Sequence, residues 1–404
     1  MNNGLVVSDN GITAQPTRLD ARSSIVPKVN LLRPNLLRVN LCSLISLTML
    51  LCWAPLQACE AREFLQALPG YQFKFPRDHA AHEDFRTEWW YYTGHLETAD
   101  HKLYGYELTF FRNGMAKADE KDHSPWKLNN IYLAHFAVSD IGNKQFHYFQ
   151  KLNRGGQGPA GANSDNYFVY NENWFVERLG KQMVMRAESP GFSIHLDLES
   201  AKPEAIHGEN GVSQKATCKG CASHYYSLTR LQTSGFIYID GKPAAVTGTS
   251  WMDHEFGSNQ LTKEQVGWDW FSLQLSNNTE VMLYLMRNSN GGIDPNSSGT
   301  VISSDGSTRH LKINDFKVTA TKKWKSPSSK GVYPMEWLVD IPSEQCKLKI
   351  TPAFERQELE TDKSTGVTYW EGACKTEGSF QQKPVKGEAY VEMTGYSVQF
   401  KNNI

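Results

Sequence analysis

The sequence predicts an all-β protein that contains two antiparallel β-barrels in tandem. More than sixteen short stretches with strand-like alternation follow one another, with turn residues between them and almost no helical periodicity. Aromatic residues make up 12% of the 404-residue chain, including 11 Trp, which favours sheets packed around large side chains. That many strands exceed what one small closed barrel holds, so two barrels fit better.

The individual strands follow from alternation and from turn residues. Tyr104, Tyr106, Leu108 and Phe110 share one face of an expected strand, and Asp240-Gly241 indicates a tight turn. In the first half, strands are expected at residues 89–97, 102–112, 131–139, 144–150, 174–179, 182–187, 192–199, 223–230 and 236–240. In the second half, they are expected at 268–275, 280–287, 301–304, 307–313, 316–321, 335–341, 347–352, 367–371 and 388–394. A short helix is expected at 61–68.

The N-terminal 58 residues resemble an extension followed by a signal peptide. The apolar run at 41–53 is about 13 residues long, too short to span a bilayer and typical of a secretory signal. Leu56-Gln57-Ala58-Cys59 then resembles a bacterial lipoprotein cleavage site, which predicts a lipid on Cys59 and membrane association by that anchor. The alternative is ordinary cleavage after Ala58, which leaves Cys59 as a free thiol. Either way, we expect a cell-envelope protein, in the periplasm or at the outer membrane.

The remaining chain divides into two expected domains of ordinary size, at residues 59–257 and 258–404. Forty-two Lys and Arg balance 43 Asp and Glu, giving a net charge of −1. Without a basic surplus, we expect no nucleic-acid partner.

Four cysteines remain beyond Cys59, and an even number in an exported protein predicts two disulfides. Cys346 and Cys374 are the expected pair of the second domain. Cys218 and Cys221 form a CxxC in a polar loop, which would suit a small-loop disulfide, half of a zinc site or a redox pair. A zinc site needs two more ligands, and a redox pair needs a helix beside a βαβ unit, so a structural disulfide is preferred.

The densest chemical cluster is WMDHEFG at residues 251–257. In an extended segment, Asp253 and Glu255 share one face and His254 takes the other. Neighbouring aromatics would desolvate a carboxyl group and raise its pKa, as a general acid requires. The three residues are therefore the candidate catalytic groups, and a buried network joining the barrels is the alternative. A lone His-Glu pair lacks the second His of a zincin, so no metal is expected.

Aromatic clusters supply the candidate ligand-binding residues. Alternation places Trp268 and Trp270 on one side of a strand and Asp269 with Phe271 on the other, and a cavity lining or simple core packing would each explain it. Arg287 ends the next strand and would pair with a nearby acid. The candidate set for an apolar ligand is Glu88, Trp89, Trp90, Tyr91, Trp251, Trp268, Trp270, Tyr284 and Arg287.

Six motifs together resemble the carotenoid 1,2-hydratase/AttH-like family of two-domain, lipocalin-like bacterial proteins. They are HEDFRTEWWYYTG at 82–94, YELTFFR at 106–112, WMDHEFG at 251–257, GWDWF at 267–271, YWEG at 369–372 and GEAYVEMTGY at 387–396. The resemblance implies tandem lipocalin-like barrels, an apolar pocket and no cofactor. It also makes an export-type ABC permease a partner to consider.

The resemblance implies two alternative functions. The first is an envelope lipoprotein that binds a hydrophobic small molecule or lipid. The second is an enzyme that performs hydratase-, hydrolase- or isomerase-type acid–base chemistry on such a molecule. The carotenoid branch places an Asp just after a Tyr on the strand that follows the GWDWF-like segment. Here Leu285 follows Tyr284, which argues against carotenoid hydration itself.

Overall fold

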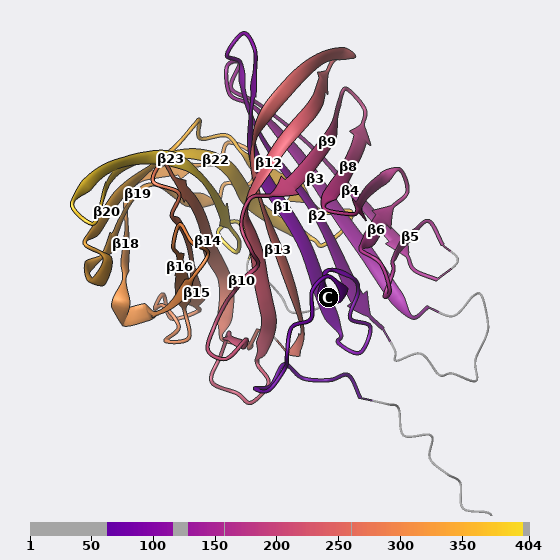
Figure 1. The fold of residues 1–404 in the computed structure, drawn as a ribbon, viewed down its shortest axis with the longest axis horizontal. Coiled ribbons are helices and arrows are strands. Elements are labelled where there is room, and N and C mark those ends of the chain that lie inside the picture. Colours follow the sequence, from indigo (N-terminus) through magenta and orange to yellow (C-terminus); the bar gives the residue numbers. More distant parts are fainter. Residues whose placement is uncertain (1–62, 116–127, 157, 260, 399–404) are drawn as a thin grey trace, which may run out of the picture. The chain divides into compact units, whose positions relative to one another are not determined.

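The computed structural model describes residues 63–115, 128–156, 158–259 and 261–398 (Figure 1). These residues form two antiparallel sheets, one of 13 strands and one of 10, each curled into a barrel or half-barrel. The predicted fold, all-β with two lipocalin-like barrels, is confirmed. Cys59 and the expected signal peptide lie outside the described residues. Within the described ranges, no helix has the length and apolarity needed to cross a bilayer.

The first sheet runs in the order β4-β3-β2-β1-β13-β12-β9-β8-β7-β6-β5, with β10 and β11 paired to β12. Its edges meet through side chains, since Asn153 donates to the Oδ1 of Asn171 (2.7 Å) and Asn171 donates to the carbonyl of Tyr132 (3.2 Å). Its strands are β1 (Thr87–Thr98), β2 (Leu103–Gly114), β3 (Asn130–Asp140), β4 (Gln145–Arg154), β5 (Ala160–Ala162), β6 (Phe168–Asn171), β7 (Trp174–Leu179), β8 (Gln182–Ser189), β9 (Phe192–Ser200), β10 (Ala205–Ile206), β11 (Ser213–Gln214), β12 (Ala222–Ile239) and β13 (Lys242–Asn259).

The second sheet runs in the order β17-β16-β15-β14-β23-β22-β20-β19-β18, with β21 paired to β22. Its strands are β14 (Gln265–Leu275), β15 (Glu280–Asn288), β16 (Ser298–Ile302), β17 (Thr308–Lys312), β18 (Lys317–Lys325), β19 (Val332–Ile341), β20 (Cys346–Pro352), β21 (Glu358–Thr361), β22 (Val367–Phe380) and β23 (Lys383–Met393). The described helices are the short 3-10 turns η1 (Arg77–His79), η2 (Ile313–Asp315) and η3 (Pro342–Glu344).

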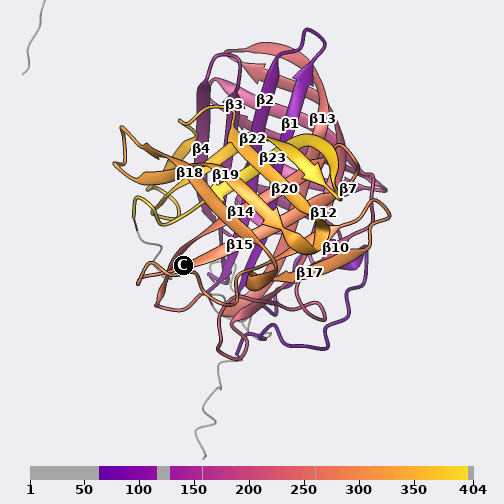
Figure 2. The same ribbon diagram turned by 90° about the vertical axis from the view of Figure 1, so that its left-hand side faces the viewer.

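Each barrel has its own apolar core, and a third apolar cluster lies between the barrels. Trp90 and Tyr92 of β1 point into the first core, whereas Tyr91 between them points outward to the second barrel. There it meets Trp270 of β14 at 5.2 Å between ring centroids. In Figure 2 the orange and yellow strands of the second sheet cross in front of the indigo and magenta strands of the first. The outer faces of the two sheets therefore form the joint between the barrels.

Two sequence-based expectations are corrected by the structure. Residues 63–68 are not helical, so the expected helix at 61–68 is wrong over its described part. The strands expected at 223–230 and 236–240 are one strand, β12, which a register shift between Leu228 and Leu231 bends without ending. The domain boundary expected after residue 257 lies near the end of β13 and stays a prediction.

The predicted Cys346–Cys374 disulfide is also wrong, because both thiols are free and buried. Cys346 begins β20, whereas Cys374 lies on β22 opposite Pro352, at the other end of β20. Six residues of extended chain separate the two positions by about 20 Å, far beyond disulfide reach. The expected bridge between Cys218 and Cys221 is present, with 5.3 Å between their Cα atoms.

Candidate functional site

A chamber of about 110 Å³ lies between the two barrels, and we call it the inner chamber. Alternation on β1, β12 and β13 aims one row of side chains into it, and β14, β15, β22 and β23 supply the opposite row. Its wall combines aromatic rings with four acids and one cation. The lining residues are Trp89, Tyr91, Phe111, Lys215, Tyr225, Asp253, Glu255, Leu261, Trp268, Trp270, Tyr284, Met286, Tyr369, Glu371 and Glu392.

Asp253 is the acid most tightly held by its surroundings. Three donors bind its carboxyl group: the Tyr225 hydroxyl (2.5 Å), the Trp251 indole N–H (2.5 Å) and the Ser227 hydroxyl. Burial raises the pKa of Asp253 to about 7, and the three hydrogen bonds oppose this rise by favouring the ionised form. Asp253 can therefore accept or release a proton near neutral pH.

Glu255, on the same face of β13, pairs with Lys215 at 3.1 Å. The Lys215 ammonium group also lies over the rings of Tyr284 (4.3 Å) and Tyr225 (4.9 Å). Burial alone would lower the pKa of Lys215, but Glu255 and its other anionic neighbours outweigh burial and raise it. Lys215 therefore stays charged, and it is the only cation among the residues that line the inner chamber.

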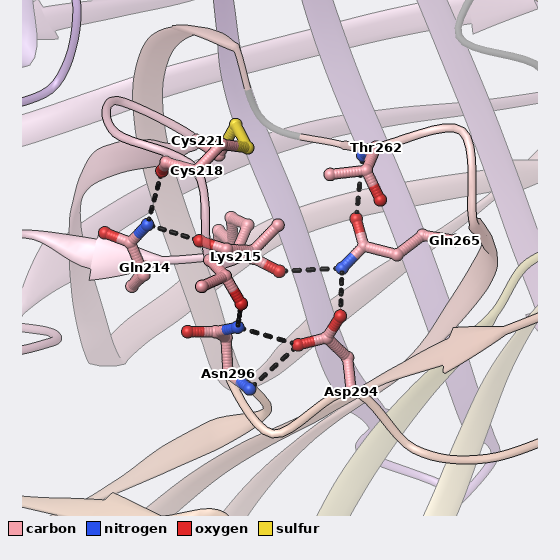
Figure 3. The surroundings of a disulfide bond; sticks show 10 residues. Gln214, Lys215, Cys218, Cys221, Thr262, Gln265, Asp294 and Asn296 are labelled. Carbon is pink, nitrogen blue, oxygen red and sulfur yellow. Dashed lines mark hydrogen bonds between the residues drawn. A yellow bond between two sulfur atoms is a disulfide. The ribbon is translucent and has the colours of Figure 1, made fainter.

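The disulfide loop holds Lys215 at this wall (Figure 3). Gln214 donates to the carbonyl of Cys218 (3.0 Å), which fastens Lys215 to the bridged loop. From the second barrel, the Gln265 amide donates to the carbonyl of Lys215 (2.7 Å) and to Asp294 (3.1 Å). The disulfide-bonded loop thus positions the Lys215 side chain in the site.

Glu371 and Glu392 bring two further carboxyl groups from the second barrel. They are direct cross-strand partners on β22 and β23. Burial, followed by the charges of Glu392 and Glu107, raises the pKa of Glu371 well above its ordinary range. Burial, together with Asp253 and Glu255 across the chamber, raises the pKa of Glu392 to about 8, against a hydrogen bond from Trp268. Glu392 is therefore largely protonated at neutral pH.

A second chamber of about 260 Å³ opens from the first, and we call it the outer chamber. The two chambers share six lining residues: Trp89, Phe111, Leu261, Trp268, Tyr369 and Glu392. At its wall, His135 contacts the Tyr369 hydroxyl (2.5 Å) and the Ser364 hydroxyl (2.9 Å). Burial lowers the pKa of His135 to about 3, so this imidazole is neutral. As one of the six shared residues, Glu392 lines both chambers.

His254 lies on the opposite face of β13, inside the first barrel. Its ring contacts Glu88 (2.8 Å) and the Tyr226 hydroxyl (3.0 Å), and Glu88 in turn forms an ion pair with Arg112 (3.0 Å). Although burial opposes it, Arg112 holds the pKa of Glu88 well below its usual range, while burial lowers the pKa of His254 to about 4. Glu88 and His254 line neither chamber, whereas Arg112 also contributes to the wall of the outer chamber. The network fixes β1 against β13.

His82, Glu88 and His254 place three potential ligand atoms within 4.8 Å of one another. One Glu88 oxygen already contacts both imidazoles, and the other accepts from Arg112. A cation there would displace the paired guanidinium group from its carboxylate. The residues present therefore fit an internal hydrogen-bond network better than a metal centre.

The structure divides the sequence-predicted site residues between the two faces of the first barrel. Five of the predicted ligand-binding residues line the inner chamber together with Asp253 and Glu255: Trp89, Tyr91, Trp268, Trp270 and Tyr284. Trp251 does not line the chamber, but its indole N–H donates a hydrogen bond to Asp253. Glu88, Trp90 and His254 point into the first barrel, and Arg287 pairs with Asp269 (3.1 Å) away from the chamber.

Sequence reasoning missed Lys215, Tyr225, Glu371 and Glu392. One signal was available for two of them: Glu371 follows Trp370, and Glu392 stands between Val391 and Met393, where a surface acid would be unusual. Lys215 and Tyr225 carry no such signal, because only the folded loop and β12 bring them to Asp253.

Comparisons with known proteins agree with this architecture. The family model for AttH-like proteins matches residues 66–396. The crystal structure of an AttH-type protein of Nitrosomonas europaea is 32% identical and superposes with a TM-score of 0.75, covering 82% of this chain and 100% of that one.

Two fungal proteins are similar at lower identity. The structure of kievitone hydratase from Nectria haematococca is 15% identical with a TM-score of 0.63, covering 83% of this chain and 98% of that one. The dehydratase asqC of Emericella nidulans is 21% identical over 282 residues, covering 66% of this chain and 77% of its own length. The match over residues 66–396, together with the 32% identity, shows that the chain belongs to the AttH-like family.

Proposed function

We propose that this protein is a hydro-lyase, an enzyme that adds water to, or removes water from, an apolar molecule bound between the barrels. The observation that carries the proposal is the pair of carboxyl groups, Asp253 and Glu392, which face one chamber with pKa values of about 7 and about 8. A site that only retained an apolar ligand would not need two such groups. Elimination of water needs one base and one acid.

The environments of the two acids assign their roles. Three hydrogen-bond donors favour ionised Asp253, so Asp253 is the base. Glu392 has the higher pKa and is the acid. In dehydration, Asp253 takes a proton from carbon and the C–H electron pair forms the new double bond. The adjacent C–O bond breaks with its electron pair, and the hydroxyl leaves as water with the proton of Glu392. Hydration is the reverse sequence.

Lys215 would orient the substrate in this reaction. Its charge lies at the chamber wall, 3.1 Å from Glu255 and above two tyrosine rings. A hydrogen bond from this ammonium group to a substrate oxygen would hold the reacting carbons between Asp253 and Glu392 and stabilise negative charge that develops there. The aromatic walls would exclude bulk water and hold the apolar part of the molecule.

The names of the two fungal relatives, a hydratase and a dehydratase, support water transfer as the reaction class. We further propose that the protein works in the cell envelope, anchored by a lipid on Cys59, because residues 56–59 resemble a lipoprotein cleavage site. An ABC-type export permease would be a partner in that setting. The alternative function, retention of a hydrophobic molecule without reaction, makes a different prediction in the same experiment.

The test is to incubate the protein with an apolar extract of its source cells in water enriched in ¹⁸O, and to compare masses before and after. We expect at least one metabolite to gain or lose one water, or to take up ¹⁸O. The Asp253→Asn variant should lose this activity, by about 100-fold or more. Asp165→Asn, which changes an exposed acid of the same barrel, should keep it. A molecule that co-purifies but never changes mass would support a binding protein instead.

A further inference from the structure

Behind the inner chamber, three carboxyl groups and one phenol are gathered at the joint between the barrels. They are Glu107 of β2, Glu371 of β22, and Tyr390 and Glu392 of β23, and we call them the carboxyl cluster. Glu107, Glu371 and Tyr390 are almost completely buried, and Glu371 and Glu392 both line the inner chamber. Tyr91 of β1 donates to Glu371 (2.8 Å) and closes the cluster on the side of the first barrel.

The close approach of two strands creates this arrangement. A Cβ atom on Gly105 would lie only 2.5 Å from the Cβ of Ala373, so the absence of a side chain there lets β2 pack directly on β22. Glu107 lies two residues from Gly105 on the same face of β2, and Glu371 lies two residues from Ala373 on the same face of β22. The register of β22 and β23 then adds Glu392 opposite Glu371 and Tyr390 opposite Ala373.

Each of the buried members of the cluster has a polar atom without a protein partner. Three such atoms are buried and neither accept nor donate a hydrogen bond among the described residues. They are Glu107 Oε2, Glu371 Oε1 and the Tyr390 hydroxyl. Burial and their mutual charges raise the pKa values of all three groups well above the ordinary range. Buried polar groups without protein partners are most often satisfied by an ordered water, which typically makes about three hydrogen bonds.

We infer that the carboxyl cluster is an enclosed water-binding site that passes protons to and from Glu392 by way of Glu371. The inference deepens the proposed hydro-lyase function and rests on it for the direction of proton flow. Each dehydration leaves Glu392 without its proton and Asp253 with an extra one. Before the next turnover, one proton must leave Asp253 and one must reach Glu392. Protonated Glu371 would give its proton to Glu392 and regain one through the water and Glu107. Over a turnover, the one proton that Asp253 releases balances the one that this relay takes up.

A metal ion is a poorer occupant than water. A metal site would need at least three ligand atoms within 4.8 Å of one another. Among the described residues, His82, Glu88 and His254 meet this condition and the carboxyl cluster does not. The carboxyl cluster is more widely spaced, which suits a bridging water. Protonated carboxyl groups are also poor cation ligands, because a ligand carboxylate must first lose its proton.

A high-resolution crystal structure and infrared spectroscopy of protonated carboxyl groups test the water site without an activity assay, and the kinetics of one variant test the proton path. We expect an ordered water within hydrogen-bond distance of at least two cluster members, and a carboxylic-acid band at neutral pH that weakens in Glu107→Gln. Tyr390→Phe should displace the water and lower kcat, by less than the about 100-fold loss expected for the acid itself, with KM unchanged. Tyr333→Phe, which removes an unpaired buried hydroxyl from the second core, should change none of these.

The alternative outcomes overturn the inference. A direct carboxyl–carboxyl hydrogen bond with no water, the absence of an acid band at neutral pH, or a melting temperature that rises with added Ca²⁺ in the wild type but not in Glu107→Gln would each exclude a water and proton site. These readouts do not depend on Asp253. If Asp253→Asn kept full activity, the proposed function would fail while the water site could still be present.

Discussion

Glu371 on β22 and Glu392 on β23 are direct cross-strand neighbours, so two carboxyl groups of like charge share one face of the second sheet. Two ionised carboxylates in this position would repel each other and destabilise the pairing of the strands. Burial and neighbouring acids raise the pKa values of both groups, which keeps at least one of them protonated. At least one of these two carboxyl groups therefore carries a proton at the wall of the inner chamber.

The proton on Glu392 makes the stability of the folded protein depend on pH. The pKa of Glu392 is about 8 in the folded protein, above its ordinary value of 4.5, so the folded state binds a proton that the unfolded state loses. The stabilisation is complete below pH 4.5 and is lost as the pH rises through about 8. We expect Glu392→Gln to lose less thermal stability than the wild type between acidic and alkaline pH. Equal losses in thermal melts across this range would contradict the raised pKa.

The ion pair inside the first barrel should have a structural role only. Arg112→Met leaves the Glu88 carboxylate buried without its cation, which should lower the free energy of unfolding by about 3–5 kcal/mol. Arg86→Met, which changes an exposed arginine at the mouth of the outer chamber, serves as the control for stability. Denaturant titration measures both. A stable Arg112→Met protein that had lost its activity would show that the Glu88–His254 network takes part in the reaction.

Two lysines of the disulfide loop offer a matched comparison. Lys215→Met should raise KM by about tenfold or more, because a charged hydrogen bond to the substrate is lost. Lys219→Met removes the same charge from an exposed position in the same loop and should leave KM unchanged. Since Lys215 also pairs with Glu255, melting temperatures must be measured alongside. Equal effects of the two substitutions would indicate long-range charge attraction and not a contact in the site.

The lipid anchor is tested by fractionation. Cys59→Ser should move the protein from the membrane fraction to the soluble periplasm, because the modified thiol is the attachment point. Mass spectrometry of the wild-type N-terminal peptide should show the added acyl chains. A Cys59→Ser protein that stays in the membrane fraction would refute lipidation at this residue.

Alternation and turn residues predicted the fold and one wall of the site. Asp253 and Glu255 were expected on one face of a strand with His254 on the other, and β13 has this arrangement. The same reasoning placed Trp268 and Trp270 together, and both face the inner chamber. Local period-2 patterns were sufficient here because each strand has one face toward its own core and one toward the joint.

What the sequence did not predict depends on long-range register. The Cys346–Cys374 pairing failed because an even count of cysteines says nothing about which strand positions are adjacent. Cys346 begins β20, whereas Cys374 of β22 lies beside the other end of β20. Glu88 and Trp90 were grouped with Trp89 and Tyr91 by their shared cluster, although alternate residues face opposite sides of β1. Packing of one barrel on the other, which brings Glu107 near Glu371, has no signature in the local sequence pattern.

The pH dependence of the water-transfer rate, measured on the metabolite whose mass changes in the ¹⁸O experiment, shows whether Asp253 and Glu392 act as base and acid. If Asp253 is the base and Glu392 the acid, the rate should rise as Asp253 ionises near pH 7 and fall as Glu392 loses its proton near pH 8, giving a narrow bell between them. Asp253→Asn and Glu392→Gln should each abolish the bell, whereas Asp165→Asn should preserve it. A rate that does not change across this range, or a bell that survives either substitution, would contradict the account.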